Sequence, residues 1–216
     1  MQTVNIKTRV ACFVDGFNLY HAIDDLNDKA LLWLDLRRLM ETFTDPSTHQ
    51  IVNIFYYSAM ASHRPSAAKR HVRYIKALRH SGVTVVLGSF KRKPRKCQDC
   101  EHTWFGYEEK QTDVNLAIGL VGGAYKNHYD EAFLVTGDSD ITPAVQLVKE
   151  LPKPRSIKLL SPPGRKHSKE IAQYADRLAS IKQIHIERSL FPDTIIDSSS
   201  SRIVATKPTR WMTPSN

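Results

Sequence analysis

The chain has 216 residues, 41% of them hydrophobic, which is enough for the core of one α/β domain of ordinary size. Its formal net charge of +9 favours a polyanionic partner, with nucleic acid first, over a charge that serves solubility alone. No uncharged apolar stretch approaches the roughly 18 residues of a membrane span, and Asp15 interrupts the first apolar run before it could act as a secretory signal. Three cysteines suggest no disulfide framework, so we expect a cytoplasmic protein with no membrane partner.

The first expected element is a short buried strand over residues 10–14, because this apolar run is too short and too β-branched for a surface helix. Asp15 and Gly16 follow the strand directly, and Asn18 comes shortly after them. The carboxyl ends of parallel strands line the crevice where an open sheet binds ligands, so Asp15 is expected to face solvent and substrate. These residues alone leave open a simple turn at Asp15 and Gly16, with Asn18 as a helix cap.

Helices and strands are then expected to alternate as far as residue 90. We predict helices over about 18–26, 35–43 and 66–80, and strands over 51–57 and 82–90. This alternation is typical of an α/β fold with a mostly parallel sheet. Basic residues close to the end of the strand over 51–57 are candidates for phosphate contacts, whereas the others on the helix over 66–80 are read as a solvated face. The candidates are His63, Arg64 and Arg70.

The segment over residues 91–110 departs from this pattern and is read as a basic insertion that contains cysteines. Pro94 and the repulsion between neighbouring like charges predict an exposed arm or loop without regular structure. Trp104, Phe105 and Tyr107 add flat rings on which unpaired bases can stack, although the rings could equally pack on the body of the domain. The nucleic-acid-binding candidates here are Lys91, Arg92, Lys93, Arg95, Lys96 and Trp104.

The cysteines of the insertion have the spacing of half a zinc knuckle. Cys97 and Cys100 form a CxxC pair, and His102 could supply a third ligand. A closed structural zinc site needs four ligands, and the sequence offers no second cysteine pair to complete it. A redox dithiol and two inert thiols are the other readings, and the pair does not begin a helix after a strand as a thioredoxin-like motif would.

After the insertion, the sequence predicts a helix over 113–126, a strand over 131–135, a helix over 141–150 and a last parallel strand over 156–160. The loop over 161–169 follows at the carboxyl end of that strand and is basic, so Arg165 and Lys166 are further nucleic-acid-binding candidates. From about residue 188 onward, serines, prolines and few apolar residues predict a flexible tail over 188–216. Trp211 lies in this tail, and the sequence does not indicate what it packs against.

Acidic residues recur at the ends of strands and the starts of helices. Asp113 opens the helix over 113–126, and Asp138 and Asp140 follow the strand over 131–135, as Asp15 follows the first strand. Each acid also has a local explanation as a helix cap. If the four carboxylates meet at one edge of the sheet, their mutual repulsion favours a divalent cation, and oxygen ligands suit Mg²⁺ or Mn²⁺.

Three segments together resemble the NYN family, a branch of the PIN-like nuclease superfamily. They are residues 13–20 (FVDGFNLY), 112–117 (TDVNLA) and 135–140 (VTGDSD), and the resemblance extends from about residue 8 to about residue 186. It implies a three-layer α/β/α domain over residues 1–187 with a central, mostly parallel sheet and the insertion at 91–110. It also implies a metal-dependent nuclease, most often acting on RNA, with Asp15, Asp113, Asp138 and Asp140 as catalytic and metal-binding positions and Asn18 beside them.

The functional hypothesis is therefore hydrolysis of phosphodiester bonds, with single-stranded RNA as the expected partner and Mg²⁺ or Mn²⁺ as the cofactor. An RNA-binding or regulatory protein with little or no catalytic activity is the main alternative, because the same basic surface serves both. A phosphatase of the haloacid dehalogenase type ranks third, since that fold needs an acid two residues after the nucleophile and Phe17 stands there. PIN-like domains often pair, so the resemblance leaves room for a homodimer.

Overall fold

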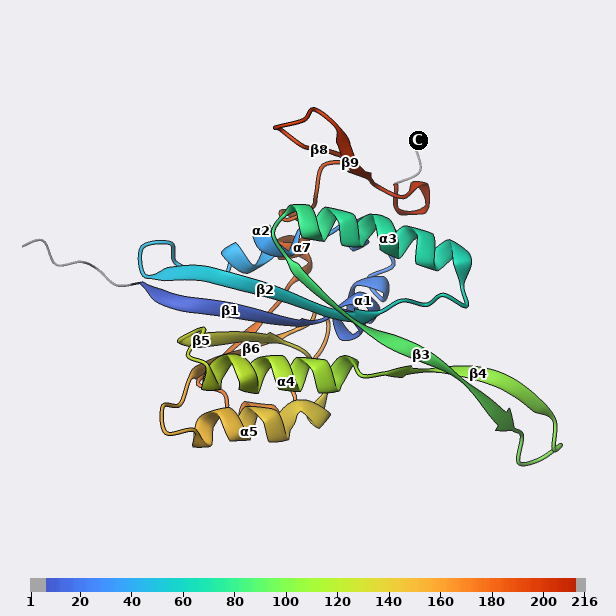
Figure 1. Ribbon diagram of the computed structural model, residues 1–216, viewed down its shortest axis with the longest axis horizontal. Helices are drawn as coiled ribbons and strands as arrows, with labels where there is room; N and C mark the ends of the chain where they lie inside the picture. Colours follow the sequence, from blue (N-terminus) through green and yellow to red (C-terminus); the bar gives the residue numbers. More distant parts are fainter. Residues whose placement is uncertain (1–6, 213–216) are drawn as a thin grey trace, which may run out of the picture.

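The structure, a computed structural model, describes residues 7–212 and is built on a seven-stranded sheet (Figure 1). The strand order is β4-β3-β2-β1-β5-β6-β7, and every neighbouring pair is parallel except β3 and β4. The α/β fold with a mostly parallel sheet is thus confirmed. The strands are β1 (Thr8–Asp15), β2 (His49–Ala59), β3 (Thr84–Lys96), β4 (Thr103–Lys110), β5 (Glu131–Val135), β6 (Ser156–Ser161) and β7 (Arg177–Ser180).

Helices cover both faces of the sheet and enclose two separate cores, which completes the three layers. One core includes side chains of α1 (Gly16–Asp24), η1 (Lys29–Leu32), α2 (Leu36–Glu41), α3 (Pro65–His80) and α7 (Gln183–Glu187). The other includes side chains of α4 (Thr112–Tyr125), η2 (Ser139–Ile141), α5 (Thr142–Glu150) and α6 (Lys169–Ala172). No helix within residues 7–212 combines the length and the apolar character of a membrane span.

The position of β1 at the centre of the sheet determines where a ligand site can form. From β1 the chain continues to β2 on one side, and it later crosses to β5 on the other side of β1. Such a reversal opens a crevice at the carboxyl ends of the two strands, where doubly wound sheets bind their ligands. Asp15 ends β1, and residues 136–140 follow β5, so both acidic segments lie at this crevice.

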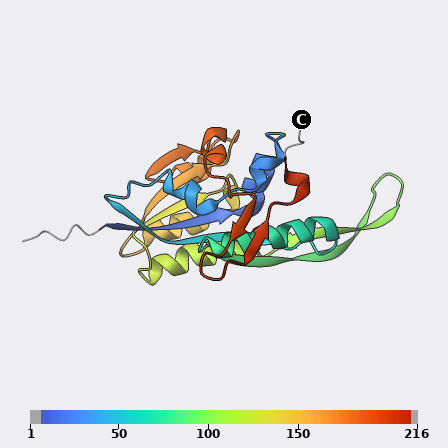
Figure 2. The same ribbon diagram turned by 90° about the horizontal axis from the view of Figure 1, so that it is seen from above.

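The basic insertion is regular, contrary to the arm without regular structure that was expected. The end of β3 and all of β4 pair antiparallel from Ser89 and Lys110 to Lys96 and Thr103, and this ribbon projects from the body of the domain (Figures 1 and 2). Cross-strand contacts offset the repulsion between its cations. Lys93 pairs with Glu108 at 2.6 Å, and the Arg92 guanidinium lies 3.5 Å from the centre of the Phe105 ring. The expectation of an irregular arm was based on the number of like charges alone, because the partners of these charges across the ribbon cannot be identified from the sequence.

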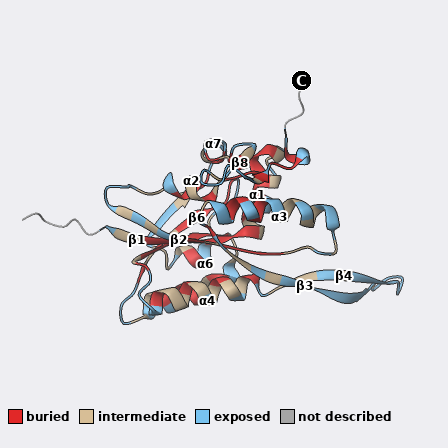
Figure 3. Cartoon of the chain, turned by 45° about the horizontal axis from the view of Figure 1, so that its top comes forward, coloured by how far each residue is buried: buried red, intermediate tan, exposed pale blue. Residues whose placement is uncertain are grey.

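The segment after residue 188 is also ordered as far as the structure describes it, so the expectation of a flexible tail is wrong for residues 188–212. It forms β8 (Thr194–Ile196), β9 (Ile203–Thr206) and η3 (Thr209–Trp211), and β9 packs on α3. Trp211 is buried, with its ring centre 6.2 Å from that of Trp33 and 6.1 Å from that of Tyr74. The fold buries some of the few apolar residues here, including Phe191 and Ile195, and leaves others exposed. Figure 3 shows this mixture of buried and exposed positions around β8. Residues 213–216 of the expected tail lie outside the described residues.

Candidate active site

Asp15 is the most buried acid of the candidate site. It ends β1 and caps α1, and only 4% of the residue is exposed. Its Oδ1 accepts a hydrogen bond from the Asn18 backbone N–H at 3.0 Å, and its Oδ2 accepts one from the Thr136 hydroxyl at 3.0 Å. Burial raises the pKa of the Asp15 carboxyl, and these two hydrogen bonds oppose that rise. A buried carboxyl with two fixed donors is held in one orientation at the carboxyl end of the central strand.

The residue after Asp15 must be glycine for this geometry. A Cβ atom on Gly16 would lie 2.6 Å from the Tyr57 carbonyl oxygen and 2.6 Å from the Tyr56 ring. Neither distance is compatible with a side chain, because the carbonyl belongs to the adjacent strand β2. Glycine at position 16 therefore allows α1 to begin in direct contact with strand β2. A turn that only reverses the chain direction would not need glycine for this reason.

Asn18 joins the two strand ends of the crevice. Its Oδ1 accepts a hydrogen bond from the Gly137 backbone N–H at 3.0 Å, which ties α1 to the loop after β5. A Cβ atom on Gly137 would lie 3.1 Å from the same Oδ1, so the close approach also favours glycine there. Asn18 is more than a simple cap, since its side chain positions the loop that carries Asp138.

The loop after β5 is organised by Thr136, whose hydroxyl both donates to Asp15 and accepts from the Asp138 backbone N–H at 3.0 Å. Asp138 in turn caps η2, because its Oδ1 accepts from the Asp140 backbone N–H at 3.0 Å. Asp138 is half-buried and Asp140 is exposed. The local reading of Asp138 as a cap is therefore correct, and it leaves its second carboxylate oxygen free of that role.

Asp113 lies in the first turn of α4, where an acid is favoured by the helix dipole. Its pKa is raised to about 6, first by burial and then by the negative charges of Asp15, Asp138, Glu109 and Asp140. The four predicted acids therefore lie near enough to interact electrostatically, although they come from β1, α4 and the loop after β5.

Glu109 is a fifth acid in this region, and the sequence analysis did not single it out. It comes from the base of β4, and its Oε1 accepts a hydrogen bond from the Thr112 backbone N–H at 3.1 Å. Its neighbour Glu108 points to Lys93 and Lys110 on the ribbon instead. Only the alternation of side chains along a strand distinguishes the two, and the insertion was not predicted to contain a strand.

The donor chemistry of this region suits a hard divalent cation, because every acidic ligand candidate offers carboxylate oxygens. Burial, and then the repulsion between these acids, raises the Asp113 pKa. Among the residues that the structure describes, the side chains are not arranged around a common point as metal ligands would be. Within residues 7–212, no three His, Cys, Asp or Glu side chains are gathered in an arrangement that could hold a metal ion. A cation would therefore require the exposed or half-buried carboxylates to turn toward Asp15.

The three zinc-ligand candidates lie at the outer end of the ribbon. The backbone N–H of Cys97 donates to the His102 carbonyl at 2.8 Å, which closes the end of the hairpin. Hydrogen bonds from the Cys100 and Asp99 backbone N–H groups lower the pKa of the Cys97 thiol. The His102 ring lies alongside Trp104 with ring centres 6.2 Å apart. In the described part of the chain these three residues do not form a metal-ligand cluster, so the zinc reading gains no support.

The basic candidates fall into two groups. Some already have partners: Arg92 lies on Phe105, Lys93 pairs with Glu108, Lys96 pairs with Glu101 at 2.8 Å, and Arg165 pairs with Asp25. The aromatic candidate Trp104 is 45% exposed. The remaining exposed cations of the ribbon and of the loop after β6 are Lys91, Arg95 and Lys166. His63, Arg64 and Arg70 instead line a cavity beside the acids.

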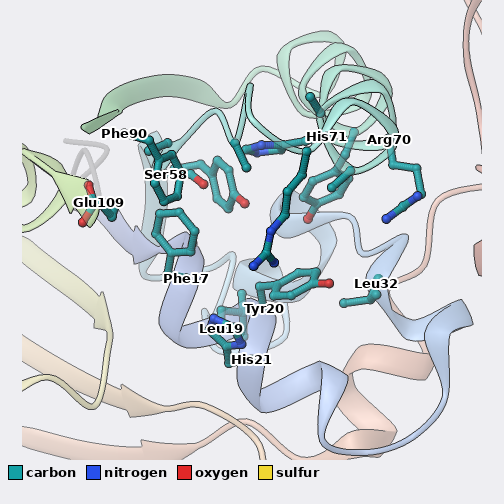
Figure 4. A pocket seen from close by; sticks show the side chains of 18 of the residues that line it. Phe17, Leu19, Tyr20, His21, Leu32, Ser58, Arg70, His71, Phe90 and Glu109 are labelled. Carbon is teal, nitrogen blue, oxygen red and sulfur yellow. The ribbon is translucent and has the colours of Figure 1, made fainter. Parts of the chain in front are cut away.

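This cavity has a volume of about 530 Å³ and lies between α1, α3 and the base of the β3–β4 ribbon (Figure 4). Phe17, Phe90 and Glu109 stand at one end of it, and Arg70 and Leu32 at the other. Because Gly16 and Phe17 follow Asp15 in the chain and both line the cavity, its aromatic end adjoins the acidic region. The cavity could not be anticipated from the sequence, since its walls come from segments as far apart as residues 16–23, residues 56–74 and Trp211.

Comparison with known proteins agrees with the fold. The crystal structure of VPA0982, a protein of unknown function from Vibrio parahaemolyticus, matches with a TM-score of 0.56 and 20% identity, covering 88% of this chain and all of that one. This likeness concerns the fold alone.

Two curated proteins are similar in sequence. 6-Hydroxy-3-succinoylpyridine 3-monooxygenase HspA from Pseudomonas putida is 28% identical over 180 residues, covering 67% of this chain and 56% of HspA. The chain thus matches only about half of the length of HspA. Low amplitude and bright protein LabA from Synechococcus elongatus is 23% identical over 193 residues, covering 88% of this chain and 94% of LabA.

The family comparison covers most of the chain. The NYN domain model matches residues 9–182, a range that contains all four acids, Asn18, Glu109 and the ribbon. The two acidic segments at the sheet crevice are the segments on which the resemblance rested. The chain belongs to the NYN domain family.

Proposed function

We propose that this protein is a metal-dependent nuclease that hydrolyses phosphodiester bonds of single-stranded RNA. The NYN domain has a nuclease-like fold of the PIN type, and the family is associated with nucleic-acid binding. The observation that carries the proposal is the pair of hydrogen bonds by which the Thr136 hydroxyl joins Asp15 to the backbone of Asp138 across the crevice. The Asp113 pKa, raised by burial and then by the charges of Asp15, Asp138 and Asp140, agrees with this grouping. Such a cluster of acids is stabilised by a cation.

The residues of the proposed site have two roles, since some would bind the metal ion and others hold these ligands in position. Asp15, Asp113, Asp138 and Asp140 would hold Mg²⁺ or Mn²⁺, which supplies charge stabilisation and a water of lowered pKa when bound. Thr136 fixes the Asp15 carboxyl, and Asn18 fixes the loop that carries Asp138. In the hydrolysis the oxygen of a water adds to phosphorus, the bond to one ribose oxygen breaks, and that oxygen takes a proton.

The ribbon supplies the proposed contacts with the strand. Phe105 and Tyr107 are 56% and 43% exposed for stacking of bases, and they share one face of the ribbon with Arg92. The exposed candidates Lys91, Arg95 and Trp104 lie on the opposite face. Single-stranded RNA fits this surface better than a duplex, because its unpaired bases can reach the rings.

The test compares the protein with Asp138→Asn and with Glu150→Gln, an exposed acid at the far end of α5 that serves as the matched control. Each is incubated with labelled single-stranded RNA and DNA in Mn²⁺, Mg²⁺ or EDTA. We expect cleavage of RNA by the unchanged protein and by Glu150→Gln only when metal is present, and binding without cleavage by Asp138→Asn. Equal cleavage by Asp138→Asn would overturn the assignment, and binding without cleavage by every form would favour the RNA-binding alternative.

A second candidate function is an enzyme that acts on a small heteroaromatic acid. The observation in its favour is the cavity of about 530 Å³ next to the acids, which is within the range of about 300–1,000 Å³ common for small-molecule sites. The name of HspA states that it acts on a succinoylpyridine, and that protein shares 28% identity with this chain over the matched region. Binding of a pyridine carboxylate to the cavity, compared with binding of nucleotides, separates the two candidates.

A further inference from the structure

The cavity between α1, α3 and the ribbon has walls suited to a flat ring. Phe17 and Phe90 meet edge to face with ring centres 6.0 Å apart at the end near the acids. Tyr107 stacks on His63, with ring centres 3.9 Å apart and ring planes within 4° of parallel, and 43% of Tyr107 remains exposed. Aromatic side chains that are held in place by other rings and still have free area form a stacking platform for an unpaired base.

The cavity also offers cations without internal partners. Arg64 is exposed, Arg70 is half-buried, and both line the cavity. Arg9 and Arg165 pair with Asp130 and Asp25, whereas in the part of the chain that the structure describes neither Arg64 nor Arg70 forms an ion pair with a carboxylate. Two guanidinium groups at an aromatic cavity favour a ligand that combines a ring with an anionic group, since guanidinium binds phosphate through paired hydrogen bonds.

Two ring nitrogens at the cavity lack hydrogen-bond partners. His63 Nδ1 and His71 Nε2 are both buried, and neither has a partner within residues 7–212. Burial lowers the pKa of His71 to about 4, so this imidazole is neutral at ordinary pH and offers a hydrogen bond and not a charge. Buried polar atoms are normally satisfied, so these two nitrogens are exceptions in the residues that line the cavity.

The ribbon continues the wall of the cavity outward. In an antiparallel pair, residues opposite each other point to the same face, and Arg92 lies opposite Tyr107 while Pro94 lies opposite Phe105. Phe90, Tyr107 and Phe105 are therefore on one face of the ribbon, with the Arg92 guanidinium on Phe105. A strand that stacks along this face reaches the cavity at Phe90 and Tyr107 and the acidic region just beyond Phe17.

We propose that the cavity is a nucleotide-binding subsite, in which one unpaired base lies against Tyr107 and Phe17 and its phosphate is held by Arg64 and Arg70. The assignment to a nucleotide of an RNA strand rests on the proposed nuclease function, whereas the affinity of the cavity for a nucleotide does not. The continuity with the ribbon favours a nucleotide over a free heteroaromatic acid, because a small acid would use none of the ribbon face.

The test measures binding of 5′-AMP and 5′-UMP in EDTA by calorimetry, so that no cleavage contributes. Ribose 5-phosphate, which lacks the base, and nicotinate, which is a pyridine carboxylate, are the comparison ligands. The variants are Tyr107→Leu and Arg70→Gln, and the matched control is Arg73→Gln, which removes the same charge from an exposed position of α3 that does not line the cavity. If Arg70→Gln melts at a lower temperature than the control, Arg64→Gln, whose side chain is exposed, replaces it.

We expect the nucleotides to bind more tightly than ribose 5-phosphate, and Tyr107→Leu and Arg70→Gln each to weaken them about tenfold while Arg73→Gln leaves binding unchanged. Equal weakening by Arg73→Gln, or no binding of either nucleotide, would overturn the subsite. Tighter binding of nicotinate than of both nucleotides would overturn the nucleotide assignment in favour of a heteroaromatic acid. Nucleotide binding without RNA cleavage in any metal would support the subsite and overturn the nuclease function. RNA cleavage that none of these variants affects would support the nuclease function and overturn the subsite.

Discussion

The hydroxyl of Thr136 donates to Asp15 Oδ2 at 3.0 Å and accepts from the Asp138 backbone N–H at the same distance. One side chain thereby joins the end of β1 to the loop after β5 across the crevice of the sheet. Asp15 is buried and needs such a donor, and Asp138 is held in the loop by the same hydroxyl. The two acids thus have a fixed relation that does not depend on a bound ion.

Loss of the Thr136 hydroxyl is expected to destabilise the fold. Thr136→Val keeps the shape of the side chain but leaves the buried Asp15 oxygen without its donor, which should lower the free energy of unfolding by about 1–3 kcal/mol. Urea unfolding measures this loss. In a double-mutant cycle with Asp15→Asn the effect of Thr136→Val should shrink, and an equal effect in both backgrounds would show that the hydrogen bond to the carboxylate is not its source.

Substitution of Gly16 by alanine should destabilise the protein because its Cβ would meet the Tyr57 carbonyl oxygen at 2.6 Å. We expect a loss of about 1–3 kcal/mol in the free energy of unfolding, together with weaker proposed activity as α1 moves from the sheet. Gly122→Ala is the control, because this glycine lies within α4 and a Cβ there meets nothing within 4 Å. That variant should gain about 0.5–1 kcal/mol from helix propensity, and a similar loss in both would contradict the packing argument.

Asp113 should titrate well above a free aspartate in metal-free protein. Carbon-13 NMR in EDTA is expected to give a pKa of about 6, and Asp138→Asn should lower it because one repelling charge is removed. The folded-state pKa is raised, so the stability linked to this group is present below the unfolded-state pKa and is lost as pH rises through about 6. Mg²⁺ should lower the Asp113 pKa if the acids bind it, and an unchanged titration with metal would argue against ligation by this residue.

His71 should produce the opposite pH dependence. Its pKa is lowered to about 4 by burial, so the unfolded chain takes up this proton before the folded protein does. The stability linked to His71 is therefore present above the ordinary histidine pKa of 6.5 and is lost as pH falls toward about 4. Melting of His71→Phe should show a flatter decline over this range than melting of the unchanged protein. An identical decline in both would show that His71 is not a source of the acid sensitivity.

Truncation of the Trp211 side chain should lower the free energy of unfolding by more than is usual for a residue near the end of a chain. The ring packs against Trp33 and Tyr74, so Trp211→Ala is expected to lower the free energy of unfolding by about 3–5 kcal/mol. Met212→Ala is the matched control at the next position, where the side chain is 40% exposed and the effect should stay within about 0.5 kcal/mol. Equal stability of the two variants would indicate that the segment over 188–212 is not docked in solution.

Apart from the ribbon, the order of strands and helices as far as β6 could be predicted from the sequence, together with the acids at their ends, because these are local signals. A short apolar run ending in Asp15 and Gly16 predicts a buried strand with an acid at its carboxyl end, and the run before Asp138 repeats the signal. The carboxyl ends of parallel strands share one edge, so the convergence of these acids also followed from topology.

The ribbon and the final segment were mispredicted because their order depends on partners elsewhere in the chain. Lys93 is acceptable in a strand because Glu108 lies across the ribbon, and Trp211 is ordered because Trp33 and Tyr74 receive it. Neither partner can be assigned from the residues next to the one it stabilises.

The sequence by itself determined the fold class and the family and predicted the four acids as site residues, since these rest on periodicity and on short motifs. Only the tertiary structure decided that Glu109 lies near the acids and that a cavity lies beside them. It also decided that the side chains of Thr136 and Asn18 hydrogen-bond across the crevice between the end of β1 and the loop after β5. These features are contacts between residues far apart in the chain, and such contacts depend on how the helices pack on the sheet and not on any local pattern.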